Sequence, residues 1–141
     1  MTQDTKNALA LLRKNGLTCA LCKGPSAYTD TRRGVAPLLN WLDNGMCFSN
    51  FCAADKVVGA GAAYLYVLLG VTEVYALVVS IRAREILARH GVTLYAELVV
   101  PHIVNRAGDG ICPIEQAVAE ATDPQDALTR IRHRLRELNG K

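Results

Sequence analysis

Residues 72–100 read TEVYALVVSIRAREILARHGVTLYAELVV, and this stretch decides the fold class. Thr72 to Val79 is almost continuously apolar, which is typical of a strand covered on both faces. Ser80 is a good N-cap for a helix over 81–89 that ends before a glycine. Residues 93–100 then alternate as a second strand. A strand, a helix and a strand in this order predict a parallel sheet in an α/β domain.

The chain ahead of this stretch predicts two helices and a hairpin. A first helix over 4–15 places Ala8, Leu11, Leu12 and Asn15 at helical spacing. Two β-compatible runs, 17–23 and 27–31, surround the turn signal Gly24-Pro25 and predict an antiparallel hairpin. Residues 35–43 have the apolar spacing of a short helix that packs Trp41 against the sheet. Residues 46–54 fit no single element.

A central helix follows in the pattern. Asp55 has the chemistry of an N-cap, and the segment after it is almost wholly apolar as far as Leu69-Gly70. A helix that is apolar on all sides is expected to be buried in the centre of the domain. Its glycines, Gly59 and Gly61, each cost about 1 kcal/mol relative to Ala. We expect tight packing to compensate, and the alternative is a ligand lying against the backbone.

The C-terminal part predicts a polar loop over 101–111 and two more helices. Cys112-Pro113-Ile114-Glu115 opens the first helix with proline at its favoured position. Asp123-Pro124 starts the last helix, which is amphipathic and is expected to cover the sheet. The apolar face of that helix is formed by Leu128, Ile131, Leu135 and Leu138.

Composition narrows the class of protein. The chain has 141 residues, half of them apolar and 21% charged, which fits one folded domain over 1–141. A formal charge of +3, dispersed along the chain, does not call for nucleic acid as a partner. The apolar run Val57 to Val71 is shorter than the roughly 18–20 residues that span a bilayer, so no membrane partner is expected. Five cysteines, an odd number, and no signal peptide predict reduced thiols and a cytoplasmic location.

Several chemistry-bearing motifs are missing or weak. There is no phosphate-binding loop ending in Gly-Lys-Ser/Thr, no dinucleotide glycine fingerprint and no His-Glu-x-x-His pair. Cys19 and Cys22 have redox or zinc spacing, but residues three apart in a strand point to opposite faces. Cys47, Cys52 and Cys112 are too loosely spaced for an ordinary zinc site. We therefore expect no metal, no cofactor and no catalytic histidine.

The most informative segment is 99–115, VVPHIVNRAGDGICPIE. A loop that leads into a helix N-terminus directs backbone N–H groups toward an anion. Cys112 at that position is a candidate thiolate nucleophile, with Arg106 adding positive potential. Glu115 is either the returning member of a capping box or an acid/base group. Asp55 poses the same choice between a helix cap and chemistry, whereas a solvated turn accounts for Lys56.

These residues also resemble a known family. The segment Asp55-Lys56-Val57-Val58-Gly59, the strand ending in Ser80, Asn105-Arg106 and Cys112-Pro113-Ile114-Glu115 together resemble domain of unknown function 1893. The likeness covers nearly the whole chain and includes residues 17–19, 33–39 and the helix that starts at Asp123-Pro124. One departure is Ala60, because the family commonly has lysine at this place in the central helix.

The resemblance implies a cytidine-deaminase-like fold, a three-layer α/β/α sandwich with a mixed sheet and a site where two central helices begin. Zinc deaminases carry His-x-Glu and Pro-Cys-x-x-Cys at those helix starts, and neither motif is present here. The family therefore implies a deaminase-like cleft without catalytic zinc. The rim residues that the resemblance implies are Asp55, Gly59, Ser80, Asn105, Arg106, Cys112 and Glu115.

Three hypotheses about function follow. The favoured one is a domain that binds a small anionic or nucleotide-like ligand through Gly59, Ser80, Asn105 and Arg106. The second is a metal-independent enzyme in which Cys112 acts with Asp55 or Glu115 as acid or base. The third is an assembly protein that forms homo-oligomers.

Overall fold

A computed structural model describes residues 1–14 and 16–140 and contains one mixed five-stranded sheet with six helices. The strand order is β2-β1-β3-β4-β5. β1 pairs antiparallel with both β2 and β3, whereas β3, β4 and β5 run parallel. The hairpin and the strand–helix–strand unit predicted from the sequence are confirmed. The strands are β1 (Cys19–Lys23), β2 (Ser26–Asp30), β3 (Cys52–Val58), β4 (Glu73–Ser80) and β5 (Thr93–Val100).

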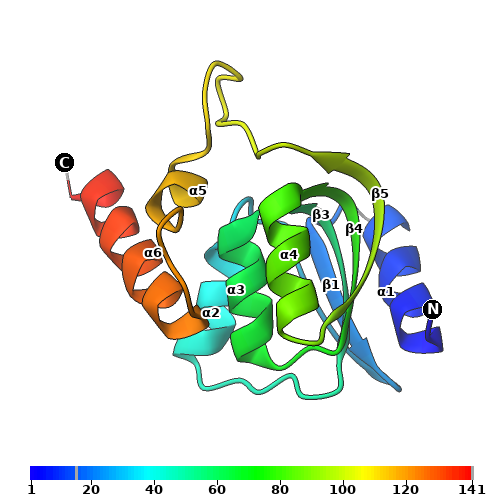
Figure 1. The fold of residues 1–141 in the computed structure, drawn as a ribbon. Coiled ribbons are helices and arrows are strands. Elements are labelled where there is room, and N and C mark those ends of the chain that lie inside the picture. The colour runs from blue at the N-terminus through cyan, green and yellow to red at the C-terminus, as the bar shows by residue number, and fades with distance from the viewer. Residues whose placement is uncertain (15, 141) are drawn as a thin grey trace.

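Helices cover both faces of the sheet (Figure 1). One face is covered by α1, which packs on β1, β3 and β4, and the other by α3 and α4. α2, α5 and α6 lie further out and contact α3. The helices are α1 (Gln3–Lys14), α2 (Ala36–Asp43), α3 (Ala60–Leu69), α4 (Ile81–Arg89), α5 (Pro113–Ala117) and α6 (Pro124–Asn139).

Asp55 does not cap the central helix, contrary to the prediction. It lies inside β3, and the N-cap of α3 is Gly59. A short run of apolar residues fits a buried strand as well as a buried helix, so periodicity could not place the boundary between them. The rest of the prediction for α3 is confirmed, because every residue from Ala60 to Tyr66 is buried.

The amphipathic last helix packs on other helices and not on the sheet, so that prediction is also wrong. Ile131 of α6 is fully buried in the main core, with Leu128 and Leu135 packed beside it. The main contacts of α6 are with α3 and α5. An apolar stripe records that a helix face is covered but not what covers it. The start of α6 is as predicted, since Asp123 accepts a hydrogen bond from the Asp126 N–H at 2.8 Å.

Two apolar clusters lie on the two faces of the sheet. Cys19 belongs to the large cluster beneath α3 and α4, and Cys22 belongs to the small one beneath α1. The prediction that these two thiols point to opposite faces is therefore confirmed. In α1, Ala8 and Leu12 are buried as its spacing predicted, while Asn15 lies outside the described residues.

The predicted cap of the helix after β4 is confirmed. The Ser80 hydroxyl accepts a hydrogen bond from the Ala83 N–H at 3.1 Å.

Across residues 1–14 and 16–140, no helix is both long enough and apolar enough to span a bilayer.

Candidate functional site

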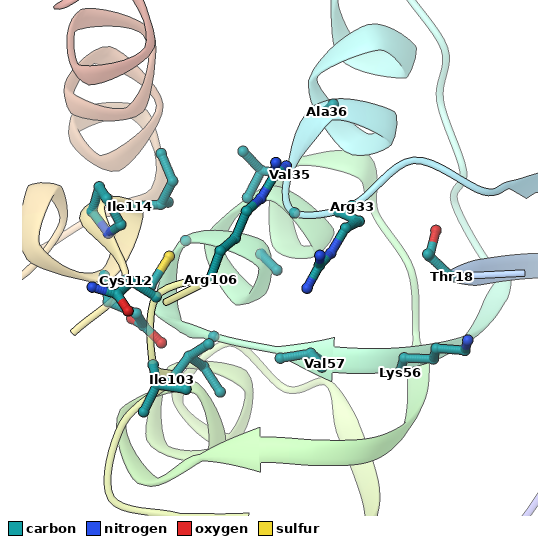
Figure 2. Close-up of a pocket in the computed structure, with 18 of the residues that line it drawn as sticks. Thr18, Arg33, Val35, Ala36, Lys56, Val57, Ile103, Arg106, Cys112 and Ile114 are labelled. Carbon is teal, nitrogen blue, oxygen red and sulfur yellow. The ribbon is translucent and has the colours of Figure 1, made fainter. Parts of the chain in front are cut away.

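A cleft of about 1550 Å³ opens where β3, β4 and β5 end. Its lining includes one valine near the end of each of these strands, Val57, Val78 and Val100. One wall is the segment that enters α2, and the opposite wall is the loop over 101–112 followed by α5 (Figure 2). Parallel strands present their carboxyl ends at one edge of a sheet, where α/β proteins place ligands.

Three cations line this cleft, and each comes from a different part of the chain. Arg33 precedes α2, Lys56 lies in β3, and Arg106 lies in the loop after β5. Figure 2 shows the side chains of Arg33 and Arg106 entering the space above β3. All three residues are exposed, and none pairs with a carboxylate within 4.0 Å in the described part of the chain.

Asp55 also lines the cleft, half-buried in β3. Its Oδ2 accepts a hydrogen bond from the Tyr66 hydroxyl of α3 at 2.6 Å. Its Oδ1 accepts one from the Val57 N–H at 3.2 Å. Burial raises the pKa of Asp55 to about 7, and these hydrogen bonds offset only part of that effect. The carboxyl can therefore exchange a proton near neutral pH.

Glu115 caps a helix, but the helix is not its own. Both of its carboxylate oxygens accept from the Ala60 N–H at the start of α3, at 3.0 and 2.9 Å. The predicted capping box within α5 is thus wrong, because the side chain turns away toward a longer helix. Burial raises the pKa of Glu115, while the Ala60 bond, Ser80 and the charges of Arg82 and His102 lower it. A carboxylate at a helix N-terminus is favoured by the helix dipole.

The two glycines of the central segment are explained by this contact. A Cβ on Gly59 would lie 2.3 Å from Glu115 Oε1, and a Cβ on Gly61 would lie 2.6 Å from Ile114 Cγ2. Both glycines therefore allow α5 to approach the start of α3 closely. Gly61 lies inside α3, where tight packing on α5 compensates for its low helix propensity as expected, whereas Gly59 is the N-cap, a position that tolerates glycine.

Cys112 stands at the N-cap of α5 and lines the cleft, half-buried. In Figure 2 its sulfur lies on the same side of the cleft as Arg106. α5 spans only Pro113–Ala117, so its dipole is small compared with that of a full helix. The N-terminus of α3, which is longer, is occupied by Glu115. The helix start at Cys112 is therefore a weak source of positive potential in the cleft, and the cationic side chains are the stronger source.

Asn105 organises the loop that carries Arg106. Its amide donates to Asp109 Oδ1 at 2.9 Å, and its carbonyl oxygen accepts from the Asp109 N–H at 3.2 Å. Val104 and Ile111 form an isolated antiparallel bridge beneath this turn. The Asn105 side chain lines the cleft while shaping the turn that presents Arg106.

Ser80 does not line the main cleft. It lines a separate cleft of about 330 Å³ together with Arg82, His102 and Glu115. His102 and Glu115 line both clefts, so they stand between them. The structure thus brings six of the seven candidate residues to the main cleft and leaves Ser80 at the smaller one. The six are Asp55, Gly59, Asn105, Arg106, Cys112 and Glu115.

Sequence reasoning missed Arg33 and Tyr66, and it read Lys56 as a solvated turn. The pair Arg32-Arg33 before Gly34 was a visible signal, because two basic residues preceded a break in the chain. Tyr66 gave no signal, since a tyrosine in an apolar helix is ordinarily a core residue. Within residues 1–14 and 16–140 no three His, Cys, Asp or Glu side chains form a group that could hold a metal ion.

Comparison with known proteins places the chain in a family. The fold is similar to that of a DUF1893 family protein from Thermotoga maritima, whose crystal structure superposes with a TM-score of 0.85. That alignment has 22% sequence identity and covers 97% of this chain and 92% of the other. No curated protein matches the sequence. The family model for the domain of unknown function DUF1893 matches residues 7–135, and the protein therefore belongs to this family.

Proposed function

We propose that the main cleft binds a small anionic or nucleotide-like ligand. The observation that carries this proposal is the set of Arg33, Lys56 and Arg106, which line one cleft and have no carboxylate partners among the described residues. Exposed cations without a carboxylate partner are common on protein surfaces, and these three are distinguished because separate segments bring them to one cleft. Guanidinium groups suit phosphate and carboxylate because they donate two parallel hydrogen bonds.

The apolar part of the cleft suits the rest of such a ligand. Val35, Val57 and Ile103 also line it (Figure 2). Ligand sites in proteins commonly combine an apolar lining with a few polar groups that fix orientation. A phosphate or carboxylate near Arg33 and Arg106 would leave an uncharged ring or chain against these side chains.

The proposal includes the deaminase-like character that the sequence resemblance implies. A sheet covered by helices on both faces, with the main cleft beside the start of α3 and the smaller cleft beside the start of α4, supports that kind of fold. The residues at these starts, Gly59-Ala60 and Ser80-Ile81, include no histidine or cysteine. They do not fit the zinc ligand set of a deaminase, so the proposed role is binding without a catalytic zinc.

Calorimetric titration of the protein with inorganic phosphate, a nucleoside monophosphate and a nucleoside triphosphate tests the proposal. We expect the nucleotides to bind, with an affinity that falls as salt rises, because screening weakens exposed charge pairs. Arg33→Ala and Arg106→Ala should each weaken binding by roughly tenfold, as expected for loss of a charged hydrogen bond. Arg89→Ala is the matched control, since Arg89 is an exposed residue at the end of α4 outside the cleft. Absence of binding, or equal losses in all three variants, would exclude an anion site here.

A second function is supported by Cys112 and Asp55 lining the same cleft. In that function Cys112 attacks an acyl or related centre, and Asp55 serves as acid or base because its pKa is about 7. Glu115 is less available for this role, since both its oxygens accept from Ala60 N–H.

4-Nitrophenyl acetate tests this second function. The Cys112 thiolate would form a thioester with the acetyl group and release 4-nitrophenolate, and water would then hydrolyse the thioester. Cys47 lies outside the cleft but is exposed and would itself react with the ester, so the assay uses a Cys47→Ser background, in which we expect nitrophenolate release to be lost in Cys112→Ser. Release that is unchanged in Cys112→Ser would rule out this nucleophile.

A further inference from the structure

We propose that the ligand of the main cleft carries, besides its anionic group, a nitrogen with N–H donors that binds Asp55. This inference rests on the proposed function and adds the chemical class of the ligand. Asp55 would be the residue that determines specificity, and Tyr66 would be the residue that positions it.

The hydrogen bonds of Asp55 leave part of its carboxylate unused. An ionised carboxylate offers about four lone-pair sites. The protein fills one on each oxygen, through the Tyr66 hydroxyl and the Val57 N–H. Because Asp55 lines the cleft, a ligand bound there would meet this residue. A ligand nitrogen with two N–H groups, or an ammonium, matches this acceptor.

The charge of Asp55 is not balanced by the protein. No Lys, Arg or His nitrogen in residues 1–14 and 16–140 lies within 4.0 Å of it. The titratable groups around it are Tyr66 from α3 and Cys19, its register partner in β1. Neither carries a positive charge, which agrees with the raised pKa of the carboxyl. A half-buried carboxylate without a cation is costly, and a donor-bearing ligand would offset that cost.

Tyr66 holds the carboxylate in place. Its side chain is fully buried within α3, and its hydroxyl donates the 2.6 Å hydrogen bond to Asp55. Tyr64, two residues earlier in α3, instead donates to the backbone oxygen of Ala121 at 3.0 Å. The hydroxyls of the two tyrosines in α3 therefore donate to different acceptors, a backbone oxygen and the Asp55 carboxylate. Only Tyr66 acts on a group of the cleft.

The cleft is thus polar in two different ways. Arg33, Lys56 and Arg106 supply positive charge, whereas Asp55 supplies an acceptor that none of them neutralises. The complementary ligand is a small molecule with a phosphate or carboxylate and a separate amino-bearing group. Two sources share this chemistry: a mononucleotide with an amino-bearing base, and an aliphatic aminophosphate.

Two matched pairs of probes test the inference by calorimetry at pH 7.5. GMP is compared with IMP, which lacks the exocyclic amino group, and phosphoethanolamine is compared with glycerol 3-phosphate, which lacks the ammonium. We expect the amino-bearing member of one pair to bind roughly tenfold more tightly than its partner. The pair that shows the difference identifies the source. In Asp55→Asn the difference should disappear while sensitivity to Arg33→Ala remains.

Tyr66→Phe and Tyr64→Phe provide a second, matched comparison that does not depend on the folding of Asp55→Asn. We expect Tyr66→Phe to reduce the difference in affinity between the two members of the pair, and Tyr64→Phe to leave that difference unchanged. If anions bind through Arg33 but neither pair shows a difference, or the difference survives Asp55→Asn, this inference is wrong and the proposed function stands. If none of the four probes binds, the proposed function fails as well.

Discussion

The carboxylate of Glu115 occupies the space that a side chain at residue 59 would need. A Cβ on Gly59 would lie 2.3 Å from Glu115 Oε1, and the same carboxylate accepts from the Ala60 N–H. Residues 55 positions apart in the sequence therefore form one helix cap. This contact joins α5 to the start of α3 and fixes one wall of the cleft.

Gly59→Ala is expected to displace Glu115 and remove this cap. Loss of a helix N-cap costs about 0.5–2 kcal/mol, so we expect the free energy of unfolding to fall by roughly 1 kcal/mol. Chemical denaturation measures this change. In a Glu115→Ala background the carboxylate is already gone, and Gly59→Ala should then cost much less. Equal costs in both backgrounds would show that the two residues are not coupled.

Gly61→Ala is expected to push α5 away from α3. The new methyl would meet Cγ2 of Ile114, and this β-branched side chain has few other χ1 rotamers to adopt. Overpacking of this kind costs about 1–3 kcal/mol. Ile114→Ala should relieve the cost, so denaturation of the double variant checks the mechanism. A Gly61→Ala protein as stable as the wild type would contradict the close packing.

The pH dependence of stability should reflect Asp55. Burial raises the pKa of Asp55 from 3.8 to about 7, so the folded state favours the protonated form. Its stabilising contribution is therefore complete below pH 3.8 and is lost as the pH rises from there through 7. Glu115, with a raised pKa, acts in the same direction. We expect the melting temperature of Asp55→Asn to fall less steeply than that of the wild type as the pH rises from 3.8 to about 7.

Two other carboxyls, Asp30 and Glu73, change stability in the opposite direction, at more acidic pH. A hydrogen bond from Arg32 lowers the pKa of Asp30, and hydrogen bonds from Thr5 and Thr2 outweigh burial and lower that of Glu73. Their contributions are present above their ordinary pKa values and disappear in more acidic solution. If the melting temperatures of the wild type and Asp55→Asn fall with the same slope, other groups cause the pH dependence.

The five thiols should react with iodoacetamide at different rates. Cys47 is exposed, and its hydrogen bond with Ser49 lowers its pKa, so we expect it to be alkylated first. Cys112 is half-buried and should follow. Burial raises the pKa values of Cys19 and Cys22 and should protect them in the folded protein. Peptide mass spectrometry after timed labelling at pH 7.5 measures the order, and faster labelling of Cys112 than of Cys47 would indicate an activated thiolate.

Elements with a strong local pattern were predictable from the sequence. The run from Thr72 to Val100 determined a strand, a helix and a strand, because apolar periodicity and the Ser80 cap act over a few neighbouring residues. The hairpin around Gly24 and the helix after Asp123 were predictable for the same reason. Six candidate residues did reach one cleft, although their roles stay predictions.

Contacts between distant residues were decided only by the tertiary structure. Asp55 looked like a helix cap by type, but its place in the sheet made it the partner of Tyr66. Glu115 looked like a cap of its own helix, and packing gave its carboxylate to α3. The cations Arg33 and Arg106 share a cleft because separate segments meet at the ends of the parallel strands. Side-chain type and spacing specify which groups need a partner, and the packing of the elements specifies which partner each group finds.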